Sequence, residues 1–121
     1  MQKYLLDTNS IIYAINQELS LPKAQYLISI ITEIELLSYS KLSLQDEQIL
    51  KEVLSKFKIV NIINCIKDKT IEIRKNSKIK LPDSIILASS LCNSAVLVTS
   101  DKQLLNSGFV KAVEIDELVK K

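Results

Sequence analysis

Four acidic side chains stand at positions from which a folded chain could put them to chemical use. Asp7 and Asp101 each end an apolar run that is typical of a buried strand. Asp83 follows Pro82 at the start of an apolar helix, and Glu35 lies within a second one. Carboxylates that meet at one point repel each other, and a hard cation bound through oxygen relieves that repulsion. The chemistry open to them is activation of water and stabilisation of negative charge by a divalent ion.

Each of these residues also has an ordinary structural explanation. Asp7 and Asp101 occupy positions where helix N-caps occur, and a carboxylate such as Asp83 gains about 0.3–1 kcal/mol from the first turn of a helix. Glu35 borders the buried face of its helix, where a carboxylate without a partner is costly. Helical periodicity does not separate it from Glu33. The residue pattern alone therefore supports a structural interpretation and a functional one.

The composition excludes several other kinds of site. The 121 residues contain no histidine, so a histidine base, a catalytic triad with histidine and a histidine-containing zinc site are ruled out. The net charge is only +2, which predicts no strong overall attraction to nucleic acid. Cys65 and Cys92 are far apart in apolar surroundings, and we expect buried free thiols in a reducing compartment. No signal peptide or membrane-spanning run is apparent, which predicts a cytoplasmic protein that does not enter a membrane.

Strands that alternate with helices must position the acidic residues. The strands are continuous Ile, Leu and Val runs, a pattern typical of a parallel sheet that is covered on both faces. We predict an α/β fold in which residues 1–121 form a single domain, with a central parallel sheet of four to five strands and helices on both faces. The predicted strands are residues 4–6, 26–30, 59–63, 95–99 and 112–115, and the predicted helices are 10–16, 32–39, 43–57, 67–76, 83–92 and 101–105.

The ends of these strands are the place where such folds bind ligands. In open parallel sheets the site lies beyond the carboxyl ends of the strands, near the point where the strand order reverses. If the strands that precede Asp7 and Asp101 are neighbours, the two carboxylates converge there. Thr8 or Asn9 is expected to cap the first helix, and Ser43 the third.

Four stretches of the chain, in order, resemble the motifs of PIN domains. In the second stretch, Thr32 precedes an acidic residue by three positions and Leu36 follows it, and this alignment selects Glu35 over Glu33. Each motif alone is a weak signal, but four in the family's order span nearly the whole chain. The stretches are Leu5-Leu6-Asp7-Thr8-Asn9, Ile28-Ser29-Ile30-Ile31-Thr32-Glu33-Ile34-Glu35-Leu36, Leu81-Pro82-Asp83-Ser84-Ile85-Ile86-Leu87-Ala88 and Val96-Leu97-Val98-Thr99-Ser100-Asp101-Lys102.

The closest resemblance is to the toxin ribonucleases of VapBC-type toxin–antitoxin pairs. It implies an endoribonuclease that depends on Mg²⁺ or Mn²⁺, cuts RNA and halts translation. It also implies a cognate antitoxin that occupies the active site, and a homodimer. On this resemblance Asp7, Asp83 and Asp101 are expected to be metal ligands, directly or through water, and Glu35 to be a ligand or to orient the attacking water.

Other residues receive supporting roles in the same scheme. Hydrogen bonds to waters, ligands or phosphate are expected from Thr8, Asn9, Thr99 and Ser100. Six basic residues fall between Lys67 and Lys80, either on a solvated helix face or as a patch that contacts phosphate. From this stretch we take Arg74 and Lys80 as candidates for binding the substrate.

Alternative functions make different demands on the sequence. A phosphoacceptor receiver domain needs adjacent acidic residues after the first strand, where Asp7 stands alone, and a phosphoacceptor Asp after the third strand, which ends in Asn64. A phosphatase of the haloacid dehalogenase type would carry a second Asp at the position of Asn9. Two alternatives within the resembled family remain, namely a free-standing RNA-processing PIN nuclease and a non-catalytic PIN-like domain that binds RNA or protein.

Overall fold

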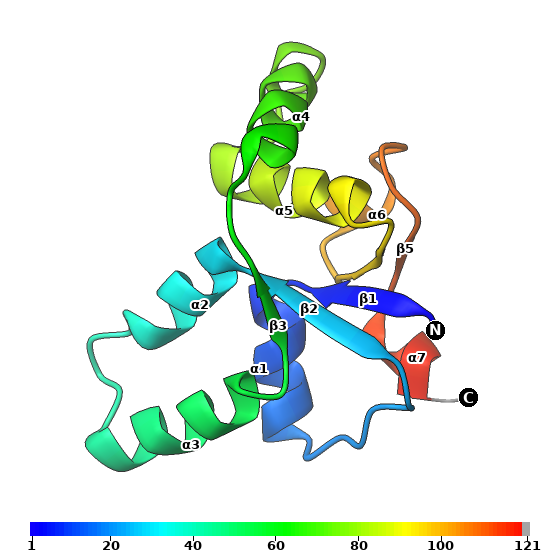
Figure 1. Cartoon of the computed structure of the whole chain (residues 1–121). Helices are drawn as coiled ribbons and strands as arrows, with labels where there is room; N and C mark the ends of the chain where they lie inside the picture. The colour runs from blue at the N-terminus through cyan, green and yellow to red at the C-terminus, as the bar shows by residue number, and fades with distance from the viewer. Residues whose placement is uncertain (120–121) are drawn as a thin grey trace.

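A five-stranded parallel sheet forms the centre of the molecule (Figure 1). In the computed structural model, which describes residues 1–119, the strand order is β3-β2-β1-β4-β5. All neighbouring strands run parallel. The strands are β1 (Lys3–Leu6), β2 (Gln25–Ser29), β3 (Lys58–Val60), β4 (Val96–Val98) and β5 (Ala112–Val113).

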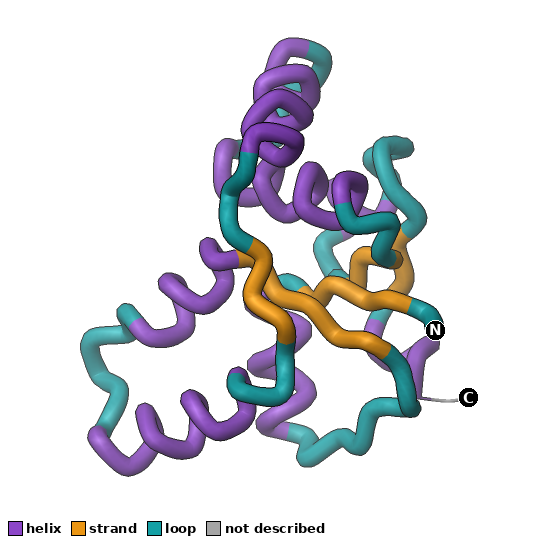
Figure 2. The backbone as a smooth tube through the Cα atoms, viewed as in Figure 1, coloured by secondary structure: helices purple, strands orange, loops and turns teal. Residues whose placement is uncertain are grey.

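Helices cover both faces of this sheet, which confirms the predicted fold class (Figure 2). One layer contains α1, α2, α3 and α7, and the other contains α4, α5 and α6. The helices are α1 (Thr8–Asn16), α2 (Ile30–Leu37), α3 (Leu44–Leu54), α4 (Asn64–Lys75), α5 (Leu81–Cys92), α6 (Lys102–Leu105) and α7 (Ile115–Val119).

Successive residues of each central strand enter opposite layers of the core. Leu5 and Leu97 pack with α4, α5 and α6, whereas Leu6 and Val98 pack with α1, α2, α3 and α7. All four side chains are fully buried. This alternation is the geometry of a pleated strand, and burial on both sides explains why the strands appear in the sequence as unbroken apolar runs.

The strand order reverses between β1 and β4, which lie side by side at the middle of the sheet. The chain runs from β1 outward to β2 and β3, and then returns to the other side of β1 to form β4 and β5. Leu6 pairs with Val98, and the Asp7 amide donates to the Val98 carbonyl at 3.1 Å. The structure thus places the residues after β1 and β4 together at one edge of the sheet.

The predicted limits of several elements need correction. The first helix begins at Thr8 and is capped by Asp7, not by Thr8 or Asn9. The third strand ends at Val60, and Ile62 and Ile63, which we assigned to it, are 45% and 60% exposed. Ile115 begins α7 instead of ending β5. In each case an apolar run continues past the strand, and the run alone does not reveal where backbone pairing stops.

The prediction of free thiols is wrong, because Cys65 and Cys92 form a disulfide. Cys65 lies in the first turn of α4 and Cys92 is the last residue of α5. These two helices are consecutive in the chain and pack against each other extensively. The end of α5 therefore lies beside the start of α4. The Cα atoms are 6.3 Å apart despite a separation of 27 residues. Nothing in the local sequence reveals this pairing.

None of the helices within residues 1–119 combines the length and the apolar character needed to span a membrane.

Candidate active site

Asp7 is the most firmly held of the predicted site residues. It is only 9% exposed. Its Oδ1 accepts the Ser10 amide at 2.9 Å, which caps α1, and its Oδ2 accepts the Thr99 hydroxyl at 2.5 Å. Thr99 is fully buried at the end of β4. The carboxylate is therefore oriented by two strands at once, at the point where the strand order reverses.

Asp101 stands beside Asp7 across the same pair of strands. Its amide donates to the Thr99 hydroxyl oxygen at 3.1 Å, so Thr99 connects the two acidic residues. Asp101 Oδ1 accepts the amides of Gln103 and Leu104 and so caps α6. Because a single oxygen serves the cap, Oδ2 is left for another ligand. The structural interpretation of Asp7 and Asp101 as helix caps is thus correct, and it leaves each carboxylate able to act chemically.

Asp83 is the residue whose pKa is affected by the other three carboxylates. It lies in the first turn of α5 and is partly buried. Burial raises the pKa of its carboxyl above the ordinary value, and the charges of Asp101, Asp7 and Glu35 raise it further. Lys80 is near enough to oppose the effect. Side chains from four distant parts of the chain therefore meet in one electrostatic environment.

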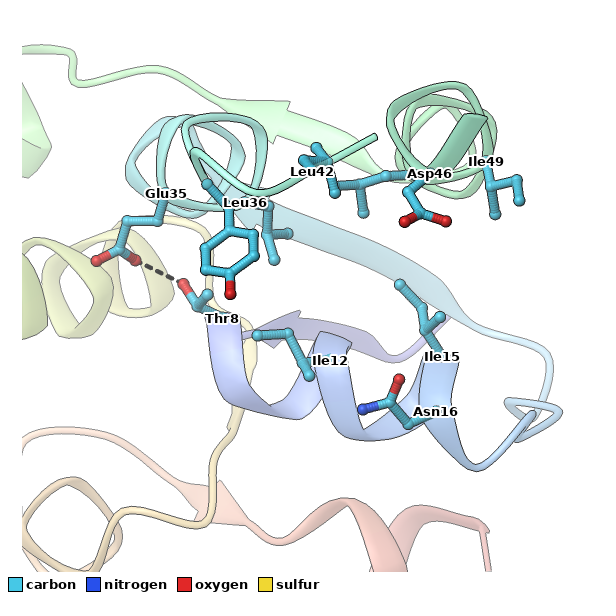
Figure 3. A pocket seen from close by; sticks show the side chains of 11 residues that line it. Thr8, Ile12, Ile15, Asn16, Glu35, Leu36, Leu42, Asp46 and Ile49 are labelled. Carbon is cyan, nitrogen blue, oxygen red and sulfur yellow. Dashed lines mark hydrogen bonds between the residues drawn. The ribbon is translucent and has the colours of Figure 1, made fainter. Parts of the chain in front are cut away.

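Glu35 reaches this cluster from α2, on the exposed side. It accepts the Thr8 hydroxyl at 2.6 Å, a bond drawn in Figure 3. The Thr8 hydroxyl also lies 3.3 Å from that of Thr32, which is fully buried. Glu33 instead lines a separate hollow with Leu37 and residues of α3. The structure places Glu35 at the surface of the cluster, whereas the sequence pattern had put it at the border of a buried face.

The donor set suits a hard divalent cation. All four candidate ligands are carboxylates, and their mutual repulsion is what an ion held through oxygen would relieve. Within residues 1–119, however, no three acidic, cysteine or histidine side chains are close enough to hold one ion as drawn. Asp7 is fixed by its two hydrogen bonds, while Glu35 and Asp101 are exposed. Closure around an ion would thus require rotation of the exposed carboxylates toward Asp7.

The remaining predicted residues divide into two groups. Asn9 and Ser100 are exposed beside the cluster and line a second hollow. Arg74 donates to the Ile79 carbonyl at 3.1 Å, so its guanidinium closes the connection between α4 and α5. Lys80 precedes α5 as its N-cap residue and acts electrostatically on Asp83. Of the two basic candidates, Lys80 is the one that the structure places beside the acidic cluster.

Two polar residues to which the sequence analysis gave no role support the cluster. Ser10 is buried, and its hydroxyl donates to the Val98 carbonyl at 3.1 Å, which ties α1 to β4. Thr32 underlies the pair formed by Thr8 and Glu35. The sequence offers one indication of this role for Thr32. It lies three positions before Glu35, and residues three apart share a helix face.

An apolar groove of about 410 Å³ opens from the cluster between α1, α2 and α3 (Figure 3). Thr8 and Glu35 lie at one end, and Ile12, Ile15, Leu42 and Ile49 line its length. Ile12 and Ile49 are 41% and 50% exposed. Two isoleucines with this much solvent exposure, both lining one apolar groove, form a surface suited to a partner or ligand.

The comparisons with known proteins agree with this geometry. The family model described as the PIN domain matches residues 4–109. No curated protein sequence matches the chain. Among solved structures, one chain of a toxin–antitoxin complex from Klebsiella pneumoniae is 32% identical and superimposes with a TM-score of 0.78, over 91% of this chain and 95% of that one.

Two further solved structures share the fold at lower identity. A chain of VapBC2 from Rickettsia felis, bound to a promoter DNA fragment, is 24% identical with a TM-score of 0.79, covering 93% of this chain and 98% of that one. A chain of DNA-bound VapBC from Salmonella typhimurium is 21% identical with a TM-score of 0.77, over 94% and 98% of the two chains. With the matched family model and the carboxylates gathered at the ends of β1 and β4, we conclude that this chain belongs to the PIN-domain family.

Proposed function

We propose that this PIN-domain protein is a metal-dependent endoribonuclease and the toxin of a VapBC-type toxin–antitoxin pair. The proposed nuclease activity is supported most directly by the effect of Asp101, Asp7 and Glu35 on the pKa of Asp83. This effect indicates that the four carboxylates share one electrostatic environment. The toxin assignment is supported by the likeness to a chain of the Klebsiella toxin–antitoxin complex.

The carboxylates have distinct tasks in this proposal. Asp7, Asp83 and Asp101 would hold Mg²⁺ or Mn²⁺ directly or through water, and Glu35 would be a further ligand or would orient the attacking water. The ion would supply a water of lowered pKa, a fixed position for a phosphate oxygen and stabilisation of charge at phosphorus. Water attacks the RNA phosphodiester in line and leaves 5′-phosphate and 3′-hydroxyl ends.

The neighbouring residues keep these groups in place. Thr99 and the amide of Ser10 fix both oxygens of Asp7. Thr8 holds one oxygen of Glu35 and leaves the other to accept from a water. Lys80, beside Asp83, offers a positive charge to the substrate phosphate without a bidentate geometry.

The apolar groove is the surface that we assign to the antitoxin. An antitoxin segment with apolar side chains would cover Ile12 and Ile49, and a basic side chain at its end would meet Glu35, so that the partner blocks the cluster. We also propose a homodimer. Helix α3 carries Leu44, which is 84% exposed, and is a candidate contact surface for the second copy. A cytoplasmic location remains a prediction.

A nuclease assay tests the proposal. Structured RNA is incubated with the protein and Mg²⁺, Mn²⁺ or a chelator, and the ends of the products are mapped. Asp101→Asn keeps a side-chain oxygen for the cap of α6 and should abolish cleavage. The matched control is Asp68→Asn on the exposed surface of α4, which should cleave like wild type.

Each negative result points to a different alternative. RNA binding without cleavage by the wild type would favour the non-catalytic PIN-like domain. Cleavage that no candidate antitoxin inhibits would favour a free-standing RNA-processing nuclease. Cleavage that persists in the chelator would refute the role of the metal.

A further inference from the structure

A second hollow, of about 300 Å³, lies beside the acidic cluster on the other face of α1 from the groove. It opens at the carboxyl ends of β4 and β5, because Ser100 follows one strand and Glu114 follows the other. Asn9, from the first turn of α1, completes the edge toward Asp7. The volume is that of a small-ligand site, and the proposed function above assigns no ligand to it.

The hollow has an apolar base and a polar rim. Ile115 is 6% exposed and forms the base with Ser10, whose hydroxyl is already used by the Val98 carbonyl. The Tyr13 side chain, 41% exposed, contributes an aromatic wall. Its hydroxyl donates to Asp116 Oδ1 at 3.3 Å, which fixes the ring against the rim. A flat, partly apolar ligand fits this arrangement better than a compact ion does.

The charge of the rim selects the chemistry of the ligand. Glu114 and Asp116 are exposed carboxylates, and among residues 1–119 no lysine or arginine lines the hollow. Such a rim repels phosphate and accepts hydrogen bonds from N–H groups. Tyr13 occupies one oxygen of Asp116, so within residues 1–119 Glu114 is the rim carboxylate that offers both of its oxygens to a ligand. The ligand is therefore an aromatic group with adjacent N–H donors.

The position of the hollow relates it to the acidic cluster. The cluster stands at the ends of β1 and β4, and the hollow stands at the ends of β4 and β5, the next pair of strands. Neighbouring strands are about 4.8 Å apart, so the two sites are separated by roughly 5–10 Å. A nucleotide next to the phosphate at the cluster could place its base in the hollow.

We propose that this hollow binds a guanine base that flanks the RNA bond to be cut, an inference that rests on the proposed nuclease function. Guanine presents its N1–H and its 2-amino group side by side, and the two oxygens of Glu114 accept both. Its ring stacks on Tyr13, as unpaired RNA bases stack on aromatic side chains. Uracil presents one N–H between two carbonyl groups, and adenine and cytosine each present one amino group beside an acceptor nitrogen.

Cleavage of matched RNAs tests the base preference. The two RNAs are identical except that inosine, which lacks the 2-amino group, replaces guanosine beside the mapped cut. Wild type should cleave the guanosine RNA about tenfold faster, the discrimination expected of one bidentate contact. Glu114→Gln should bring the two rates together, whereas Glu117→Gln, an exposed residue on α7 outside this hollow, should keep the tenfold ratio.

A binding measurement decides the matter even if no RNA is cleaved. Guanosine, inosine and uridine are titrated into the full chain, and the NMR signals of the Tyr13 ring are followed. Guanosine should bind about tenfold more tightly than the other two, and Glu114→Gln should abolish that difference. Selective guanosine binding without nuclease activity would refute the proposed function and keep the guanine site.

Two results would overturn the guanine site. The first is RNA cleavage with equal rates on guanosine and inosine RNA. The second is preferential binding of arginine amide with no preference among nucleosides, which would assign the hollow to a basic peptide.

Discussion

Replacement of Asp7 separates its structural task from its proposed chemical one. Asn at this position keeps a side-chain oxygen for the Ser10 amide, and Asn caps helices about as well as Asp does. It also removes one charge from the crowded carboxylates around Asp83. We expect Asp7→Asn to change the free energy of unfolding by less than about 1 kcal/mol, because the cap is kept and only the contact with Thr99 is altered.

Asp7→Ala provides the contrast from which the magnitude follows. Loss of the cap costs about 0.5–2 kcal/mol. The buried Thr99 hydroxyl also loses its acceptor, which costs about 1–3 kcal/mol. The sum, about 1.5–5 kcal/mol, corresponds to a fall in Tm of roughly 6–20 °C in a domain of this size.

The assay pairs urea unfolding in chelator with RNA cleavage in Mg²⁺ or Mn²⁺. Asp7→Asn should unfold like wild type and yet lose more than about a hundredfold in cleavage, since changing groups that only support metal ligands already costs about 10–100-fold. Added metal should raise the Tm of wild type and not that of Asp7→Asn. The reasoning is refuted if Asn destabilises as much as Ala, or if Asp7→Asn cleaves RNA at the wild-type rate.

Three further predictions rest on other contacts. Thr8→Val removes the hydroxyl that donates to Glu35 and should lower the rate of RNA cleavage while unfolding stays cooperative. Thr8→Ser keeps the hydroxyl and should cleave at about the wild-type rate. Equal cleavage rates for the two variants would contradict the role of Thr8 in positioning Glu35. Because the pKa of Asp83 is raised, a penalty on the fold builds up as the pH rises from the ordinary value of 3.8 to the raised pKa. The penalty is complete above the raised pKa and absent below the ordinary one. Asp83→Asn should therefore gain stability relative to wild type as the pH rises from about 4 to 7, measured by urea unfolding in chelator; a gain that does not change with pH would show that charge is not the cause. Reduction of the disulfide between Cys65 and Cys92, which are 27 residues apart in the sequence, should lower the free energy of unfolding by up to about 3–4 kcal/mol. The effect would be measured as a lower Tm in dithiothreitol. An unchanged Tm would mean that the packing of α4 on α5 is enough to hold the two helices together.

The main outline of the fold could be predicted because its cause is local. A strand that is buried on both faces must be apolar at every position, and this makes β1 and β4 visible as runs that stop at a polar residue. Asp7 and Asp101 follow those runs, so their positions at strand ends could be predicted from the pattern. The pairing of β1 with β4 entered the prediction only as a condition, and the structure shows that pairing.

Other features depend on contacts that the sequence does not display. Glu33 and Glu35 are two positions apart on one helix, and only the packing of α2 decides which of them faces Thr8. The disulfide depends on how α4 returns along α5. Ile12 is an apolar residue of α1 that is nevertheless exposed, because α2 and α3 do not close over that side of the helix.

The place of β4 within the sheet has a consequence for the protein while the ribosome is still making it. The first three strands can pair with one another early, but β1 keeps an open edge until β4 emerges and lies against it. Asp7 has no Thr99 to orient it before that moment, and Asp101 is synthesised later still. An unfinished nascent chain therefore lacks an assembled carboxylate cluster, and nuclease activity of the proposed kind can begin only after the polypeptide has passed Asp101.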